Sequence, residues 1–211
     1  DFGSFITQTY PTGQYSVDGV VIASSTLPPD FAEAFQQVGM PVVHAFGRYT
    51  STPKVNIVGI DNKNCGRIAA EHLVARGYTN IAFMGGPQNA TSTQDRLEGF
   101  MAALSERPDI KKSFSFADAY SYEAGFREMS RLINEDHAEA YFCGDDVLSI
   151  GALSAIADTA LQVPEDIGII GLNDMEMAGW ENINLTTIHQ PIAQIISSSI
   201  ELIVAMLEEP H

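Results

Sequence analysis

Short apolar runs alternate with longer amphipathic segments along most of this chain. Runs such as Val17–Ser25 and Ile81–Met84 are rich in β-branched and other bulky apolar residues, which is typical of buried strands. Segments such as Thr91–Ser105 repeat apolar residues three and four positions apart, which is the period of a helix with one buried face. Strands that alternate with helices in this way predict βαβ units, and therefore parallel sheets flanked by helices.

The alternation covers the chain from Val17 onward. We expect strands at residues 17–25, 41–46, 55–60, 81–84, 113–117, 138–143, 167–171 and 185–189. We expect helices at residues 28–38, 62–77, 91–105, 122–134, 145–160 and 191–207. Residues 1–16 follow neither period, and Pro11-Thr12-Gly13 would interrupt a regular element there. The chain is therefore predicted to be an α/β protein.

Polar residues stand where the predicted strands end. Asn173 and Asp174 follow the apolar run Ile167–Gly171, and Asp145 follows the strand at 138–143. In an open parallel sheet the carboxyl ends of the strands form one edge, and ligands bind in a crevice outside that edge. The pattern predicts a polar binding site at the ends of the strands.

Composition limits the classes of function. The chain has 211 residues, 45% of them hydrophobic, which suits one large domain or two lobes of about 100 residues each. With 27 acidic and 11 basic residues the formal net charge is −16, so the surface repels phosphate backbones. No apolar run reaches the roughly 18 residues of a membrane helix. We expect a soluble protein that binds neither nucleic acid nor membrane by itself.

Cysteine and histidine usage gives no sign of a metal site. Cys65 and Cys143 are far apart in the sequence, as in a reduced cytosolic protein rather than a secreted one held by disulfides. The five histidines are scattered, and none lies four residues from another. This spacing does not match zinc or metalloprotease motifs, so we expect no bound metal.

Aspartates at strand ends would also suit a magnesium-dependent phosphotransfer site. Such a site needs a nearby lysine, and none of the lysines falls at the end of a predicted strand. The sequence also lacks the G-x-S-x-G, Walker and G-x-G-x-x-G motifs. We therefore expect neither an enzyme nor a cofactor.

Five segments resemble the lactose-repressor (LacI/GalR) family of bacterial transcriptional regulators, in the same order and spacing. They are IDNKNCGRIAAEHLVARGYTNIAFMGGP at 60–87, DRLEGFMAAL at 95–104, AYFCGDDVLSIGAL at 140–153, VPEDIGIIGLND at 163–174 and LTTIHQP at 185–191. The resemblance implies a type I periplasmic-binding-protein-like fold, in which two Rossmann-like lobes hold a small ligand between them. It divides the chain into an amino-terminal lobe, residues 1–79 completed by 191–211, and a carboxyl-terminal lobe, residues 80–190. The family's helix-turn-helix headpiece, most of its opening βα unit and its closing strand have no counterpart in this sequence.

The resemblance places a ligand-contacting arginine at Arg96. The rigid fork of a guanidinium can grip two adjacent oxygens of a sugar, which makes Arg96 the clearest candidate contact. The alternative is an ion pair with the neighbouring Asp95. Ser92, one helical turn earlier, matches another contact position, and its alternative role is helix capping.

Asp145 and Asn173 match two further contact positions with an exchange. In most relatives the first is asparagine and the second is aspartate. One carboxylate and one carboxamide would still face the ligand, but hydrogen-bond donors and acceptors trade places. We hypothesise an unusual ligand orientation or identity rather than loss of binding. The alternative is that Asp145 only helps Asp146 to cap the following helix.

Four further residues match positions in the wall of the family's pocket. Tyr120 stands where the family carries an aromatic that stacks on the ligand, although it could also be a loop tyrosine on the surface. Phe46 ends the second predicted strand and could wall the pocket. Ile60 and Ile192 match apolar wall positions, and core packing would explain each equally well.

The apolar loop around Met177 and Trp180 has two interpretations. Trp180 could cover the ligand, but in the family this loop and the helix around Ile150 form a dimer contact. Following the resemblance, we favour a homodimer interface formed by Trp180, Met177 and Ile150, and aromatic residues and methionines are common at such interfaces.

The resemblance therefore implies the effector-binding and dimerisation domain of a LacI-type regulator. We expect its partners to be a small-molecule effector of the carbohydrate class, a second copy of the chain, and operator DNA reached only through an upstream helix-turn-helix. Such a protein would be cytoplasmic. The alternative is a secreted sugar-binding protein of a transport system, because the two classes share this fold.

Overall fold

The computed structural model describes residues 17–24, 29–48 and 55–208. The expectation for residues 1–16 falls outside these ranges, as do the predicted end of the first strand at Ser25 and the predicted start of the first helix at Pro28.

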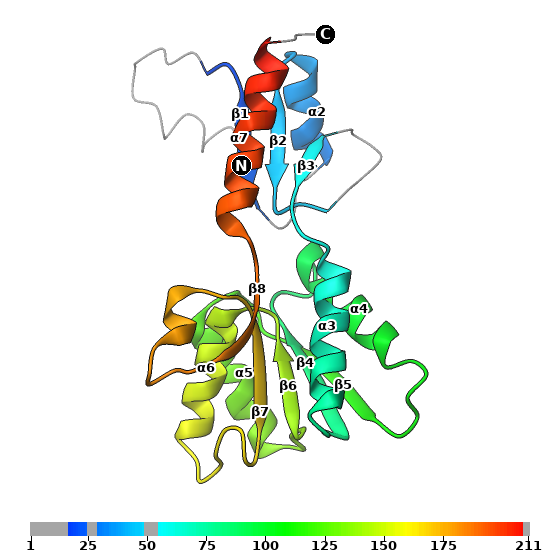
Figure 1. Cartoon of the computed structure of the whole chain (residues 1–211), viewed down its shortest axis with the longest axis vertical. Coiled ribbons are helices and arrows are strands. Elements are labelled where there is room, and N and C mark those ends of the chain that lie inside the picture. The colour runs from blue at the N-terminus through cyan, green and yellow to red at the C-terminus, as the bar shows by residue number, and fades with distance from the viewer. Residues whose placement is uncertain (1–16, 25–28, 49–54, 209–211) are drawn as a thin grey trace.

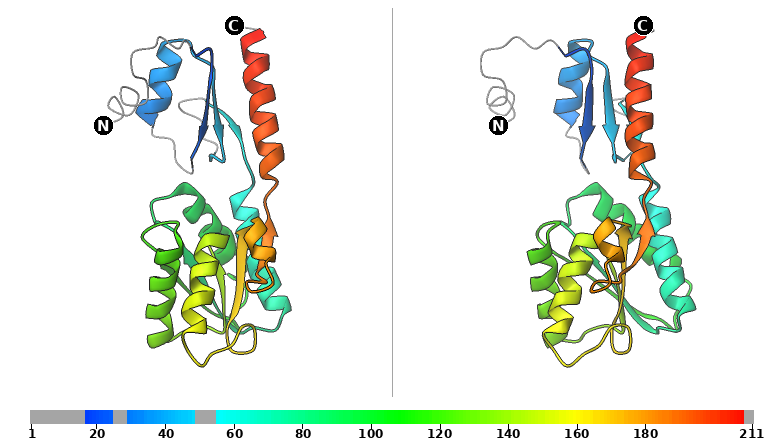
Figure 2. Two further views of the ribbon diagram at one scale, coloured as in Figure 1. Left: turned by 90° about the vertical axis from the view of Figure 1, so that its left-hand side faces the viewer. Right: turned by 60° about the vertical axis from the view of Figure 1, so that its left-hand side comes forward.

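The amino-terminal lobe is a small parallel sheet between two helices (Figures 1 and 2). Its strands β1 (Val20–Ala23), β2 (Val42–Ala45) and β3 (Asn56–Val58) pair in the order β1-β2-β3. Helix α2 (Pro29–Gln37) lies on one side of the sheet, and α7 (Ile192–Glu208), from the far end of the chain, packs on the other. This lobe is therefore assembled from both ends of the described chain.

The carboxyl-terminal lobe is a larger parallel sheet with the strand order β5-β4-β6-β7-β8. Its strands are β4 (Asn80–Gly85), β5 (Lys111–Phe116), β6 (Ala140–Cys143), β7 (Gly168–Asn173) and β8 (Thr186–His189). Its helices are α3 (Asn62–Ala75), α4 (Thr91–Ala103), α5 (Tyr122–Asn134) and α6 (Asp146–Ala157), and a short 3-10 turn, η1 (Glu176–Gly179), follows β7.

The central strands of this sheet are buried on both faces. Because side chains alternate along a strand, Phe83 and Phe142 join a core under α3 and α4, while Met84 and Tyr141 join a core under α5 and α6. Double burial requires continuous apolar runs, which is the pattern that predicts these strands in the sequence. The predicted α/β fold with two lobes of parallel sheet flanked by helices is confirmed.

The chain crosses between the lobes twice, once between β3 and α3 and once between β8 and α7 (Figure 1). The boundary expected at residue 79 assigns α3 to the amino-terminal lobe, and the packing differs from this expectation. Cys65, Ala69 and Leu73 on α3 are buried in the core of the carboxyl-terminal sheet. By packing, the first crossing therefore lies before Asn62. The sequence does not reveal this, because an amphipathic helix can cover either sheet.

Two glycines let α3 and α4 approach closely. A Cβ at Gly66 would lie 2.0 Å from the carbonyl oxygen of Arg96, and one at Gly99 would lie 1.9 Å from that of Lys63. Backbone contacts this close leave no room for a methyl group. The close packing of α3 against α4 therefore fixes where α4 presents its polar side chains.

Candidate functional site

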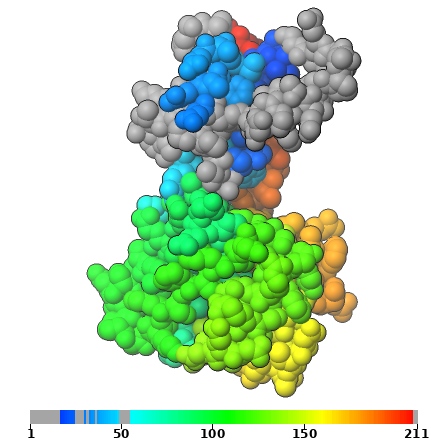
Figure 3. Space-filling model, turned by 180° about the vertical axis from the view of Figure 1, so that it is seen from behind, coloured from blue at the N-terminus to red at the C-terminus, as the bar shows by residue number. Residues whose placement is uncertain are grey.

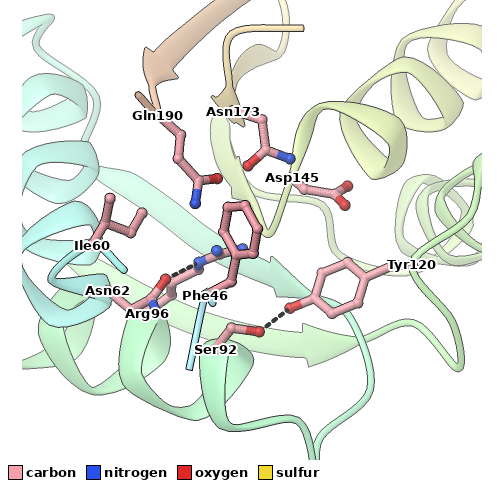
Figure 4. A pocket seen from close by; sticks show the side chains of 9 residues that line it. All are labelled: Phe46, Ile60, Asn62, Ser92, Arg96, Tyr120, Asp145, Asn173 and Gln190. Carbon is pink, nitrogen blue, oxygen red and sulfur yellow. Dashed lines mark hydrogen bonds between the residues drawn. The ribbon is translucent and has the colours of Figure 1, made fainter. Parts of the chain in front are cut away.

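A polar cleft lies where the strands of both lobes end. It has a volume of about 170 Å³, and the space-filling view shows the described surface narrowing between the lobes (Figure 3). Nine residues line it (Figure 4): Phe46, Ile60, Asn62, Ser92, Arg96, Tyr120, Asp145, Asn173 and Gln190. Five of them end a strand or follow one within two residues, namely Phe46, Ile60, Asp145, Asn173 and Gln190. This is where an open parallel sheet presents ligand-binding groups.

The structure brings together most of the predicted contact residues. Arg96, Asp145, Asn173, Tyr120, Ser92, Phe46 and Ile60 all line the cleft. Ile192 does not line it: its side chain is 39% exposed, on the same outer stripe of α7 as Ile196 and Ile200. The helical period places Ile192 on the outer face of α7, whereas Ile195, one turn further along, is buried.

Two lining residues, Asn62 and Gln190, are absent from the sequence-based set. Gln190 directly follows β8 and Asn173 is the last residue of β7, so the rule that strand ends carry polar contacts could have found Gln190. In the sequence Asn62 stands beside Asp61 at the start of a predicted helix, where both residue types commonly cap. In the structure Asp61 alone accepts the capping bond, from the Asn64 amide at 3.0 Å. This leaves the Asn62 side chain to face the cleft.

Arg96 is held in the floor of the cleft by neutral acceptors. Its Nε donates to Asn62 Oδ1 at 2.8 Å, and its Nη1 donates to the Gly144 carbonyl at 2.5 Å. The alternative ion pair with Asp95 is not formed, because Asp95 binds Arg48 instead. Among the described residues Arg96 has no ion pair, which leaves a buried cation directed at the cleft. Buried charges normally require hydrogen-bonding partners, and a ligand oxygen would be one.

Asp145 combines the two roles that the sequence left open. Its Oδ1 accepts the Leu148 amide at 2.8 Å and so caps α6, while its side chain also lines the cleft. Burial raises the pKa of this carboxyl group, and the capping bond and the charge of Arg96 partly offset the effect.

Asp146, next in sequence, does not line the cleft but forms hydrogen bonds that hold the neighbouring strand ends in place. Its side chain is fully buried, and it accepts the Met175 amide at 2.8 Å and the Thr187 hydroxyl at 2.5 Å. These bonds tie the start of α6 to the loop after β7 and to β8. Asp146 therefore supports the segment that presents Asn173.

Two lining residues have backbone conformations that are rare for residues other than glycine. Phe46 has φ of 66° and Asn173 has φ of 134°. Each such residue costs on the order of 1–3 kcal/mol, and residues of this kind cluster at ligand sites. The Phe46 amide donates to the Val58 carbonyl at 2.8 Å, which holds the turn in place.

Tyr120 forms an aromatic wall whose position is determined by its neighbours. Its hydroxyl bonds with Thr93 Oγ1 at 2.6 Å and with Ser92 Oγ at 3.3 Å. A Cβ at Gly86 would lie 2.5 Å from the ring, so the ring lies against bare backbone. Ser92 thus bonds with Tyr120, and Ala90 stands at the cap position of α4 without a side-chain bond. The capping alternative for Ser92 does not apply.

The three residues expected at a dimer interface lie in different surroundings. Trp180 is 53% exposed. Met177 is partly buried against the core beneath α5 and α6. Ile150 is buried within that core, so it offers little surface to a partner, contrary to the expectation from sequence. That expectation came from the family resemblance, and because α6 is apolar around most of its circumference, its sequence does not show which residues face the core.

Two parallel α/β lobes with a polar cleft between them define a class of ligand-binding domain. Residues 70–211 match the family described as periplasmic binding protein-like domain. The chain belongs to this family, in the form carried by LacI-type transcriptional regulators. The resemblance noted in the sequence is thereby confirmed.

Among curated proteins, the chain is 32% identical over 147 residues to the ribose operon repressor of Escherichia coli K12, covering 69% of this chain and 44% of the repressor. It is 32% identical over 187 residues to the transcriptional repressor PurR of Proteus mirabilis, and the match covers 84% of this chain and 53% of PurR. These relatives are repressors rather than enzymes. The chain spans about half the length of the curated relatives it matches.

Among solved structures, a LacI family regulator of Enterococcus faecium with bound ribose superposes with a TM-score of 0.82 at 26% identity, covering 92% of this chain and 73% of that one. The lac repressor dimer bound to operator superposes with a TM-score of 0.81 at 25% identity, and the match covers 98% of this chain and 69% of the lac repressor chain. Within the described part of our chain, none of the helices has the length and apolar character that crossing a bilayer requires.

Proposed function

We propose that this chain is the effector-binding domain of a DNA-binding transcriptional regulator and that its cleft holds a neutral monosaccharide. The observation that carries the proposal is the convergence of one guanidinium, one carboxylate and three carboxamides on a single small cleft with aromatic walls. Planar polar groups of this kind make paired hydrogen bonds to the hydroxyls of a sugar, and aromatic faces cover its C–H groups.

Volume and charge narrow the class of ligand. The cleft of about 170 Å³ is smaller than the roughly 300–1,000 Å³ of sites for drug-sized ligands, which favours a single sugar ring over a disaccharide. Arg96 and Asp145 contribute opposite charges, so a neutral solute fits better than an ionic one. The ribose-bound relative and the ribose operon repressor support a pentose as the first ligand to test.

Ligand binding would favour closure of the lobes. Phe46 and Ile60 come from the amino-terminal side of the cleft, while Ser92, Tyr120, Asp145 and Asn173 come from the carboxyl-terminal lobe. A solute that contacts both sides binds the closed arrangement more tightly, and this difference in affinity is what shifts the equilibrium. In a cytoplasmic homodimer the shift would change the spacing of two operator-binding headpieces. The operator-bound dimer of the lac repressor supports this arrangement.

Trp180, with Met177 beside it, is our proposed contribution to the dimer contact.

The secreted transport protein remains the second candidate, because the cleft would serve either role. Similarity to repressors across most of the described chain favours the regulator.

Calorimetric titration with D-ribose and a panel of other pentoses and hexoses tests the proposal. We expect one monosaccharide to bind and Arg96→Lys to weaken its binding at least about tenfold, because an ammonium cannot replace the planar fork. Arg107→Lys, at an exposed ion pair with Asp109, is the matched control and should leave the affinity unchanged. If no sugar of the panel binds, or if Arg96→Lys binds like the parent, the proposal is wrong.

A further inference from the structure

An ion pair joins the two lobes beside the cleft. Arg48 follows β2 in the amino-terminal lobe, and Asp95 lies on α4 in the carboxyl-terminal lobe. The guanidinium donates from Nε to Asp95 Oδ2 at 2.8 Å and from Nη2 to Oδ1 at 2.6 Å. Nη2 also donates to the Thr91 carbonyl at 3.0 Å. Three bonds from one side chain therefore cross from one lobe to the other.

The surroundings of this pair distinguish it from a surface ion pair. The Asp95 side chain is 10% exposed and that of Arg48 is 35% exposed. On the nearby surface, Lys63 and Glu98 pair within a single lobe, with side chains 53% and 61% exposed. Exposed single-contact pairs contribute little, whereas a bidentate arginine–carboxylate pair shielded from water is stronger and directional.

The two partners adjoin the walls of the ligand cleft without lining it. Arg48 is two residues after Phe46, and Asp95 immediately precedes Arg96. Both partners line a neighbouring cavity of about 430 Å³ that shares Ile60 and Asn62 with the ligand cleft. The ion pair therefore links the segment that carries Phe46 on one wall to the helix that carries Arg96 on the other.

We propose that Arg48 and Asp95 are a positioning pair that holds the lobes closed and so sets the affinity for the effector. The proposal rests on the function proposed above, because it gives the pair a role in binding at the same cleft. A ligand that needs both walls binds with an apparent affinity proportional to the fraction of molecules already closed. The pair raises that fraction without touching the ligand.

A double-mutant cycle tests the proposal on the protein. The variants are Arg48→Met, Asp95→Asn and the combination, with Lys63→Met and Glu98→Gln as the control cycle. The readouts are the affinity for the monosaccharide that the parent binds, the small-angle scattering radius without ligand, and the melting temperature. We expect each single change at the pair to weaken binding about fivefold or more. We expect the double variant to be no weaker than the single variants, because both remove the same interaction.

The scattering measurement separates this proposal from the one on which it rests. Without ligand, the Arg48 and Asp95 variants should have a larger radius than the parent, and the control cycle should not. If no monosaccharide binds the parent, the function proposed for the cleft fails, while the radius still decides whether the pair closes the lobes. Unchanged radii, or a lower melting temperature with the parent's radius and affinity, would overturn the positioning role. Additive losses of affinity in the double variant would overturn it as well.

Discussion

At the scale of single residues, the cleft is made of side chains that each also do structural work. Asp145 caps α6 and lines the cleft, and Tyr120 bonds with Thr93 while forming a wall. The adjacent Asp146 is purely a brace in this arrangement, bonded to the Met175 amide and the Thr187 hydroxyl. Two neighbouring aspartates therefore have different roles, which replacing each of them should separate.

Asp145→Asn should change how the stability of the protein depends on pH. Burial raises the pKa of Asp145 in the folded state above the ordinary 3.8, so the folded protein holds this proton more tightly than the unfolded chain does. The resulting stability is fully present below pH 3.8 and is lost as pH rises through the raised pKa. Asp145→Asn has no carboxyl group to ionise, so it does not lose this stability as pH rises, and its amide oxygen can still cap α6. Its free energy of unfolding relative to the parent, measured with urea, should therefore rise from pH 4 to 7.

Asp146→Asn is the comparison for that experiment. An amide cannot accept both the Met175 amide and the Thr187 hydroxyl as the two carboxylate oxygens do, so we expect a loss of about 1–3 kcal/mol at neutral pH. A gain of stability in Asp146→Asn, or a pH profile of Asp145→Asn that parallels the parent, would contradict these roles.

At the scale of elements, close helix crossings position the polar groups. Helices α3 and α4 meet at Gly66 and Gly99, and α5 and α6 meet at Gly125 and Gly151. The first crossing places Arg96 beside Asn62, to which it donates. Small residues at these crossings therefore affect the geometry of the cleft as well as stability.

Gly66→Ala should disturb both properties. The new methyl group would lie 2.0 Å from the Arg96 carbonyl, which is backbone and cannot rotate away. We expect a loss of roughly 1–3 kcal/mol of stability and a weaker affinity for sugar, measured by denaturant unfolding and calorimetry. Gly179→Ala is the control, because no atom lies within 4 Å of its added methyl group. Equal stability of the two variants would show that α3 and α4 can move apart without loss of stability.

At the scale of the whole molecule, charge and connectivity decide what the chain can do alone. A formal net charge of −16 opposes contact with polyanions, and only two connections, between β3 and α3 and between β8 and α7, join the lobes in the described chain. Any binding to operator by a regulator of this type would have to come from another segment.

The chain by itself should therefore not shift duplex DNA in a gel mobility assay. We expect no complex even at about 50 mM salt, where nonspecific electrostatic binding is strong, and no effect of added sugar. The control is the same chain fused to a basic helix-turn-helix domain, which should bind. A salt-sensitive shift by the chain alone would reveal a basic surface created by folding.

Much of the fold follows from patterns within about fifteen residues. Helix α5 begins and ends at Tyr122 and Asn134 as predicted, and most other elements agree within a few residues. Apolar runs ending in polar residues also predicted Asp145 and Asn173 at the cleft. The 3-10 turn η1 was not predicted, because one turn is too short for a periodic signal. Asn62 was missed because a residue beside a cap looks like part of the cap.

The sequence by itself determined the α/β class, the strand ends that carry polar groups and the acidic surface. These depend on local periodicity and on composition, which need no knowledge of distant contacts. Only the tertiary structure decided that α3 covers the carboxyl-terminal sheet, that Ile150 is buried and that Ile192 faces outward. It alone paired Arg48 with Asp95 rather than leaving Asp95 to Arg96. Such choices follow from how segments far apart in the chain pack together, and many packings share the same local pattern.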